Sequence, residues 1–272
     1  MLNKQNWLKM IDKKEFLLQS IIKAYIEHLE PIGSSQLKSM YDITYSPATI
    51  RGYFKKLGDE GYLAQEHVSS GRTPTTEALR QYWSSKLNFK LNFVDEKAVD
   101  YYSSQVGLTA FVLEQTSDVL KNILNVENRY MILEFSTFNV TVKFTDALYR
   151  FLSDMIGLDL IHIVNISKQV GAFEVYESVN QFLKNRDFRI FNTKEFFSLV
   201  LRFNYDEDTI EKFLKGTIFE SIENAIYFDT IVPEGYIGIC HDCIINSKES
   251  KLLVVGELSK DYEFFYNKIS MN

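Results

Sequence analysis

One stretch, SPATIRGYFKKLGDEGYL from Ser46 to Leu63, constrains the fold of this chain more than any other. Serine followed by proline is a favoured start for a helix, because serine caps the free amides and proline fits the first helical turn. Apolar residues then recur at Ile50, Phe54 and Leu57, and Gly61 falls on the same arc. The stretch therefore predicts an amphipathic helix that ends near Gly61.

The other side of this expected helix carries positive charge and a glycine. At about 100° per residue, Arg51, Gly52 and Lys55 fall opposite the apolar arc. Thr49 and Lys56 lie on one flank. Arginine can pair bidentately with guanine, lysine can neutralise phosphate, and glycine leaves room for close approach to DNA. A solvated helix face is the simpler interpretation of isolated charges, so the neighbouring elements decide between the two.

Two helices are expected before this one. Residues 13–29 carry apolar side chains at helical spacing, and Pro31 and Gly33 stop that helix. Ser34 or Ser35 can then cap a short second helix. A turn follows before the third helix, which is the arrangement of a helix-turn-helix.

A hairpin is expected after the third helix. Residues 63–68 look extended, and residues 69–71 suit the tip, where Gly71 would supply a positive φ. A further helix is expected to begin at Thr75 or Thr76. Three helices followed by a hairpin are the order of a winged helix-turn-helix, whose third helix enters the major groove and whose wing touches the DNA backbone or minor groove.

We therefore predict that the third helix and the wing contact DNA. Arg72 is placed to insert beside the backbone, and the hydroxyls of Ser69 and Ser70 can donate hydrogen bonds. His67 is expected to pack within the wing, with base reading as the alternative. The predicted DNA-binding residues are Ser34, Ser46, Thr49, Arg51, Gly52, Lys55, Lys56, Ser69, Ser70, Gly71 and Arg72.

Composition agrees with a nucleic-acid-binding head on an acidic body. The chain of 272 residues has a net charge of −6, yet residues 1–85 hold more basic than acidic side chains. With 46% apolar residues it can bury a substantial core. Its start has no apolar run of the length of a signal peptide, and no segment reaches that of a membrane span. We expect a soluble, cytoplasmic protein without membrane association.

The remainder predicts an α+β body. Residues 86–97 look like a linker, and the body from residue 98 onward alternates helical patterns with short apolar strands. Residues 98–124 are expected to form one long helix, because apolar residues recur every seven positions. That seam is Val99, Val106, Leu113 and Leu120, and it suits packing within the domain or a dimer contact. Residues 129–144 are expected to form two strands.

Patterns typical of enzymes are missing. Cys240 and Cys243 form the only C-x-x-C pair, whereas a structural zinc site needs four ligands. We interpret them as strand residues in a reducing compartment. The sequence lacks the phosphate-binding, dinucleotide-binding, zinc-protease and serine-hydrolase signatures. We expect no catalytic activity, no cofactor and no metal.

Several motifs resemble those of the HrcA-type heat-inducible transcription repressors. The matching runs are EPIGS (residues 30–34), S-x-ATIR (residues 46–51) and GYLAQEHVSSGRTPT (residues 61–75), followed by Arg80 and Tyr82. In the body, LYRFLSDMIGLDL (residues 148–160) and VVGELSKDY (residues 254–262) are similar to runs of the family.

The resemblance implies an architecture and a function. It implies a dimeric repressor on an inverted-repeat operator in double-stranded DNA, upstream of chaperone genes. It implies domains at residues 1–85 (winged helix), 86–97 (linker) and 98–272 (GAF-like body), with a dimerising segment inserted at about 150–215. It further implies that the chaperonin GroEL assists the repressor, so that heat, which diverts the chaperonin to unfolded clients, lowers repression.

One departure and two alternatives accompany this reading. The family usually has Asn-Asp where this chain has Gly52-Tyr53, so we expect an operator that differs in detail. The first alternative is a ligand-responsive regulator that senses a small metabolite through its GAF-like body. The second treats the winged helix as a protein-interaction module.

Overall fold

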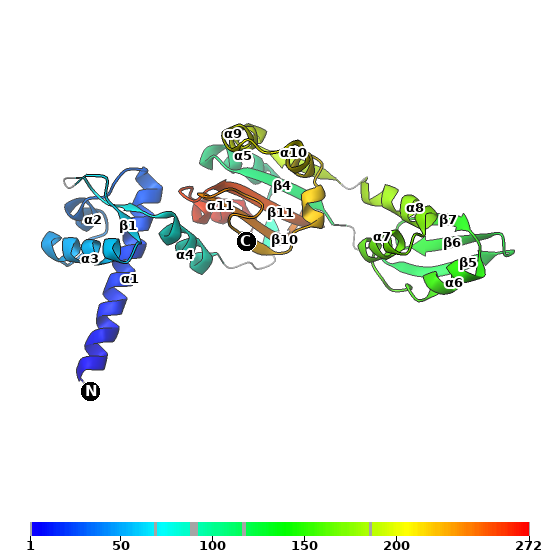
Figure 1. The fold of residues 1–272 in the computed structure, drawn as a ribbon, viewed down its shortest axis with the longest axis horizontal. Helices are drawn as coiled ribbons and strands as arrows, with labels where there is room; N and C mark the ends of the chain where they lie inside the picture. Colours follow the sequence, from blue (N-terminus) through cyan, green and yellow to red (C-terminus); the bar gives the residue numbers. More distant parts are fainter. Residues whose placement is uncertain (1, 68–69, 88–91, 116–117, 185–186, 272) are drawn as a thin grey trace. The chain divides into compact units, whose positions relative to one another are not determined.

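The computed structural model describes residues 2–67, 70–87, 92–115, 118–184 and 187–271 (Figure 1). It is an α+β fold, as the sequence predicts, and it divides into two compact units. Unit 1 comprises Met1–Phe111, Ile190–Asn246 and Leu252–Asn272. Unit 2 comprises Val112–Arg189 and Ser247–Lys251. None of the helices in the described ranges has the length and apolarity needed to cross a membrane.

Unit 1 begins with a head of helices and a hairpin. The elements are α1 (Leu2–His28), α2 (Ser34–Met40), α3 (Pro47–Asp59), β1 (Leu63–Ala64), β2 (Thr73–Pro74) and α4 (Thr76–Lys86). The strands are antiparallel, with Leu63 opposite Pro74. Leu17, Ile21, Leu37, Ile50 and Leu57 are fully buried and join α1, α2 and α3 in one core. This is the element order that the sequence predicts.

The start of α2 differs from expectation. Gly33, rather than Ser34 or Ser35, is the N-cap. The amide of Gly33 donates to the side-chain oxygen of Gln36 at 3.3 Å, so the residue three positions on reaches back to the cap. The serines are therefore inside the helix, and the hydroxyl of Ser34 is available for another partner.

Helix α4 contacts both the head and the body of unit 1. Thr75 is its N-cap, one of the two expected positions. Trp83 is buried, and its ring packs edge-to-face on Tyr262 with centroids 5.1 Å apart. Arg80 donates to the carboxylate of Asp229 at 2.5 Å and lies 5.6 Å from the ring centroid of Phe228. The head thus ends in a helix that is anchored in the body.

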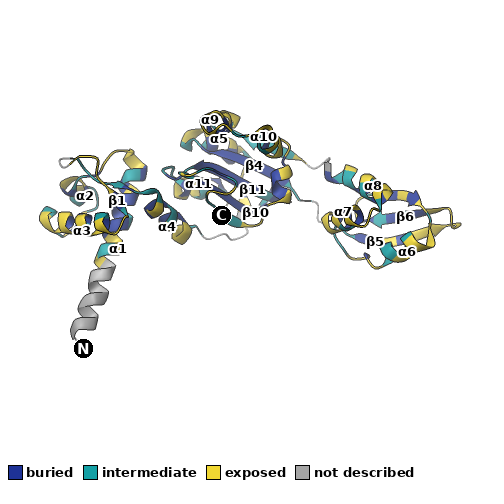
Figure 2. Ribbon diagram, viewed as in Figure 1, coloured by how far each residue is buried: buried dark blue, intermediate teal, exposed yellow. Residues whose placement is uncertain are grey.

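The body of unit 1 is built on a seven-stranded sheet. The strand order is β12 (Ser270–Met271), β3 (Asn92–Val94), β10 (Tyr236–Ile245), β11 (Lys248–Glu257), β4 (Thr109–Glu114) and β8 (Phe188–Phe191), and β9 (Ala225–Tyr227) also pairs with β10. Figure 2 shows that β4, β10 and β11 are largely buried. Pairing of β3 with β10 is parallel, and pairing of β12 with β3 is antiparallel.

The body of unit 1 also holds helices, and aromatic rings join some of them to the sheet. The helices are α5 (Glu96–Val106), α9 (Thr193–Phe203), α10 (Glu207–Leu214), a 3-10 helix (η1, Thr217–Glu220) and α11 (Tyr262–Ile269). The rings of Phe111, Phe196 and Phe213 join β4, α9 and α10, with centroids 5.2 to 5.4 Å apart. These three phenylalanines are buried and form one connected cluster in the core of the body.

The expected long helix over residues 98–124 is wrong. Helix α5 ends at Val106, because Gly107 adopts a left-handed conformation with φ of 74°. The following run forms the buried strand β4, and Leu120 begins another strand, β5 (Leu120–Val126). A strand buried on both faces has no polar alternation, so its apolar residues coincided with a spacing of seven. The predicted helical seam does not exist.

Most of unit 2 is formed by the chain between β4 and β8. An antiparallel sheet of β5, β6 (Tyr130–Phe135) and β7 (Asn139–Lys143) packs with α6 (Asp146–Ser153), α7 (Leu160–Gln169) and α8 (Phe173–Lys184). The two strands expected within residues 129–144 are β6 and β7. Unit 2 starts earlier than the expected segment of about 150–215, because these strands share their core with α7 and α8. Helices α9 and α10 belong to unit 1.

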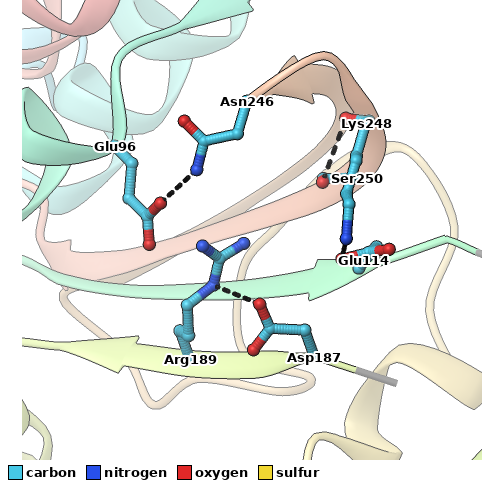
Figure 3. A network of polar contacts seen from close by, with 7 residues as sticks. All are labelled: Glu96, Glu114, Asp187, Arg189, Asn246, Lys248 and Ser250. Atoms are coloured by element: carbon cyan, nitrogen blue, oxygen red, sulfur yellow. Dashed lines mark hydrogen bonds and ion pairs between the residues drawn. The ribbon is translucent and has the colours of Figure 1, made fainter. Parts of the chain in front are cut away.

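Polar contacts link Glu114, the last residue of β4, to Lys248 of β11 and to Asp187, which precedes β8 (Figure 3). The ammonium of Lys248 lies 2.9 Å from Glu114, and Arg189 lies 3.5 Å from Asp187. The amide of Glu114 donates to the carbonyl of Asp187 at 2.9 Å. Because the ion pairs are partly exposed, main-chain bonds contribute more here than the charges do.

Candidate nucleic-acid interface

Helix α3 forms as predicted. The hydroxyl of Ser46 accepts from the amide of Thr49 at 3.1 Å, and proline occupies the first turn. Ile50, Phe54 and Leu57 are buried against the head. The helix ends at Asp59, two residues before Gly61. Local signals of the sequence therefore fix both the helix and the side that it buries.

The exposed side of α3 carries the predicted cations. We define the α3 outer face as the exposed residues Ala48, Thr49, Arg51, Gly52, Lys55 and Lys56. Three of its six residues are positively charged, which makes it suited to a polyanion. The structure thus gathers on one surface the helix residues that the sequence singles out.

Arg51 is held by Ser34. Its guanidinium donates to the Ser34 hydroxyl at 3.4 Å, and Ser34 is only 9% exposed. A buried hydroxyl beneath the arginine restricts the directions in which the guanidinium can point. Ser34 therefore supports Arg51 from the first turn of α2, and its own contact with DNA stays a prediction.

Lys56 is braced by Tyr53, a residue that the sequence reasoning left out of the site. The ammonium lies 5.7 Å from the Tyr53 ring centroid, within the range of a cation–π contact. A spacing of three residues along a helix is the signal that predicts such a pair. Tyr53 therefore draws one cation of the α3 outer face toward its own side of the helix.

Gly52 lies in the interior of α3 and is exposed. Glycine at such a position costs about 1 kcal/mol of helix stability relative to alanine. A Cβ placed on Gly52 would have no neighbour within 4 Å outside its own helical turn. Packing within the described chain does not require this glycine.

The hairpin is joined to the loop before α2. Arg72 and Ile32 exchange two main-chain hydrogen bonds, each of 2.9 Å. The expectation that Gly71 supplies a positive φ is wrong. A Cβ on Gly71 would lie 2.6 Å from the backbone of Pro31, so glycine is needed for this close approach. Arg72 is half-buried, and one of its terminal nitrogens, Nη1, is buried without a hydrogen-bond partner among the described residues.

The tip of the hairpin is partly described. The Ser70 hydroxyl donates to the carbonyl of His67 at 2.7 Å and accepts from its amide at 3.0 Å, so it closes the turn. The expected packing of His67 is wrong, because its side chain is exposed. Ser69 and the end of the expected strand at residue 68 lie outside the described residues.

The two cysteines lie in β10, as predicted, and both are buried. Burial raises the pKa of the Cys243 thiol to about 12, so it stays protonated at neutral pH. Within the described ranges, His, Cys, Asp and Glu side chains form no group that could hold a metal ion. The α3 outer face therefore remains the candidate site.

An amphipathic helix with a cationic outer face, next to a short hairpin, is an arrangement that suits contact with DNA. Residues 83–272 match the family model of the HrcA C-terminal domain. The heat-inducible transcription repressor HrcA of Helicobacter pylori is 30% identical, over 96% of this chain and 95% of that protein. HrcA of Clostridium acetobutylicum is 26% identical, over 84% of this chain and 76% of that protein. This chain belongs to the HrcA family.

A solved structure is also similar. The crystal structure of a hypothetical protein at 2.2 Å resolution aligns with 94% of this chain and 93% of that chain, with a TM-score of 0.48 and 18% identity.

Proposed function

We propose that this protein represses the transcription of heat-shock genes by binding DNA through its head. Relatives that align with nearly the whole chain carry the name heat-inducible transcription repressor. The observation that carries the proposal is the α3 outer face. Arg51, Lys55 and Lys56 are exposed there, on a helix whose opposite side is buried in the head.

The head acts in this proposal as a winged helix-turn-helix. Helix α3 enters the major groove, and the β1–β2 hairpin is the wing. Arg51 reads a base edge, while Lys55, Lys56 and Thr49 hold the phosphate backbone. Arg72 and the serines of the hairpin tip complete the contact from the wing. Ser46 fixes the start of the helix close to the DNA.

We propose a homodimer on an inverted-repeat operator upstream of chaperone genes. A dimer places two recognition helices about 34 Å apart, on one side of the duplex. Unit 2, inserted between β4 and β8, is the proposed dimerising segment. Its β5–β6 hairpin supports this, because Val126 and Tyr130 are paired and both apolar side chains are exposed.

The proposal extends to chaperonin control. The rest of unit 1 is a GAF-like body, and GroEL assists its folding in the cytoplasm. Exposed apolar side chains support the need for such help, above all Leu201, which is 82% exposed, and Phe173. Heat diverts the chaperonin, and repression falls. No catalytic step forms part of this function.

The first alternative is a body that senses a metabolite. A described pocket in the body, lined by Phe196, Tyr236 and Lys260 among others, holds about 50 Å³. Sites for small molecules usually hold several hundred Å³. This pocket therefore gives the ligand-sensing alternative little support. The second alternative, a protein-interaction module, requires a function that is insensitive to Arg51.

A promoter assay in cells tests the proposal. A chaperone promoter fused to a reporter is measured in a strain that lacks this protein and is complemented with wild type, Arg51→Ala or Lys194→Ala. Lys194 is an exposed lysine of α9 in the body and controls for loss of one charge. Wild type and Lys194→Ala should repress until heat shock, and Arg51→Ala should not repress. Equal expression in all strains would overturn the proposal.

A further inference from the structure

Gly52 occupies the centre of the α3 outer face. Successive residues of a helix lie about 100° apart, so Gly52 points away from the buried side formed by Ile50, Phe54 and Leu57. Lys55 and Lys56 follow one turn later, about 60° to one side and 40° to the other. A partner that approaches the helix from outside therefore meets position 52 first.

Neither conformation nor packing explains the glycine. Its φ is outside the left-handed region, and a Cβ there would meet open space. Two other glycines of the head do have a reason within the chain: Gly71 lies against backbone, and Gly61 has a φ of +84°. Alanine would fit at position 52 and would favour the helix. The need for glycine therefore points to a partner outside the described chain.

Two of the neighbouring cationic side chains have contacts that direct them away from Gly52. Lys56 is drawn toward the ring of Tyr53, which projects about 100° around the helix from Gly52. On the other side, Arg51 is held by its hydrogen bond to Ser34. One cation is thus directed to each side of the glycine. This is the arrangement expected of a helix whose middle, at position 52, lies close to the bases.

We propose that Gly52 is the point of closest approach between α3 and the floor of the major groove, and that its missing side chain makes the protein selective for the base pair against it. This inference rests on the proposed function. It adds that the part of the DNA next to Gly52 is the edge of a base pair and not a phosphate. A side chain there would hold α3 away from the bases and lengthen the contact of Arg51. The flexible lysines would still reach phosphates.

A matched pair of variants separates this role from helix stability. Gly52→Ala and Gly58→Ala each replace a glycine of α3, and a Cβ on Gly58 would make only an ordinary contact, 3.6 Å from the Leu63 carbonyl. Both full-length variants and wild type are titrated into a labelled duplex that holds the inverted repeat from upstream of the chaperone genes. A scrambled duplex of equal length is titrated at the same salt concentration, and thermal unfolding is followed by circular dichroism.

Both variants should unfold at or above the wild-type temperature. Gly58→Ala should bind the inverted repeat as wild type does. Gly52→Ala should bind it at least tenfold more weakly, with less than a twofold change on scrambled DNA. If Gly52→Ala binds the inverted repeat with wild-type affinity, or loses equal affinity for both duplexes, the inference is overturned. The proposed function would stand in either case. If wild type does not distinguish the duplexes, the proposed function fails and the inference with it.

Discussion

The indole nitrogen of Trp83 donates a hydrogen bond of 2.8 Å to the main-chain carbonyl of Leu258, 175 positions further along the chain. Trp83 belongs to α4, the last helix of the head, and Leu258 follows the strand β11. Both residues are buried. The end of the head is therefore part of the core of the body, and the stability of the two is coupled.

Removal of this bond should destabilise the chain. Trp83→Phe keeps an aromatic ring against Tyr262 and leaves the Leu258 carbonyl without this buried donor. We expect a loss of about 1 to 3 kcal/mol in the free energy of unfolding. Urea denaturation followed by circular dichroism measures it. Tyr101→Phe, at an exposed ring, is the control and should unfold like wild type. An unchanged midpoint for Trp83→Phe would show that the bond contributes nothing.

Gly71→Ala should disrupt the hairpin. The added methyl would overlap the backbone of Pro31, which cannot move as a side chain could. The paired main chains of Arg72 and Ile32 would have to separate, and we expect destabilisation of about 1 to 3 kcal/mol, as for overpacking. Hydrogen exchange of the Ile32 and Arg72 amides reports this directly. The alanine variant at Gly58 is the reference, and equal protection of both amides in the two variants would refute the predicted clash.

Asp118 should make unit 2 sensitive to acid. Burial opposes ionisation of its carboxyl, but hydrogen bonds from Thr137 and Ser136 outweigh burial and hold its pKa below the ordinary value. A lowered pKa adds stability at pH values above about 4, and that stability is lost as the pH falls through the folded-state pKa. Asp118→Asn should therefore cost about 1 to 3 kcal/mol at pH 7.

Urea denaturation at pH 7 and at pH 3 tests this dependence. The difference between wild type and Asp118→Asn should be largest at pH 7 and should shrink at pH 3. The exposed Asp154→Asn, in the same unit, should differ little from wild type at either pH. A constant difference for Asp118→Asn across the pH range would argue that the carboxylate charge is not involved.

Local signals predicted which side of α3 is buried and which side is exposed and cationic. Ser46, Pro47 and the apolar spacing of α3 act within one helix, so the sequence alone places the outer face correctly. Gly71 shows the limit of this reasoning. Its glycine is required by Pro31, a residue distant in sequence, and not by its own φ. A contact between residues so far apart in the sequence produces no periodic pattern from which it could be predicted.

The body was less predictable for the same reason. Apolar residues of β4 matched a helical repeat because a strand buried on both faces lacks alternation. Gly107 ends α5, but the apolar spacing of seven residues predicted a helix that continued past it. The extent of unit 2 and the link from Trp83 to Leu258 depend on packing between distant segments, which one sequence does not display.

Fluorescence anisotropy of wild type, Arg51→Ala and Lys194→Ala on inverted-repeat and scrambled duplexes, over a salt series, tests the central claim most directly. Wild type and Lys194→Ala should prefer the inverted repeat and weaken steeply with salt, because phosphate contacts release counterions. Arg51→Ala should lose that preference, with a loss of about 1 to 3 kcal/mol. Equal binding of wild type to both duplexes, or an Arg51→Ala variant that reads the repeat as wild type does, would contradict the account.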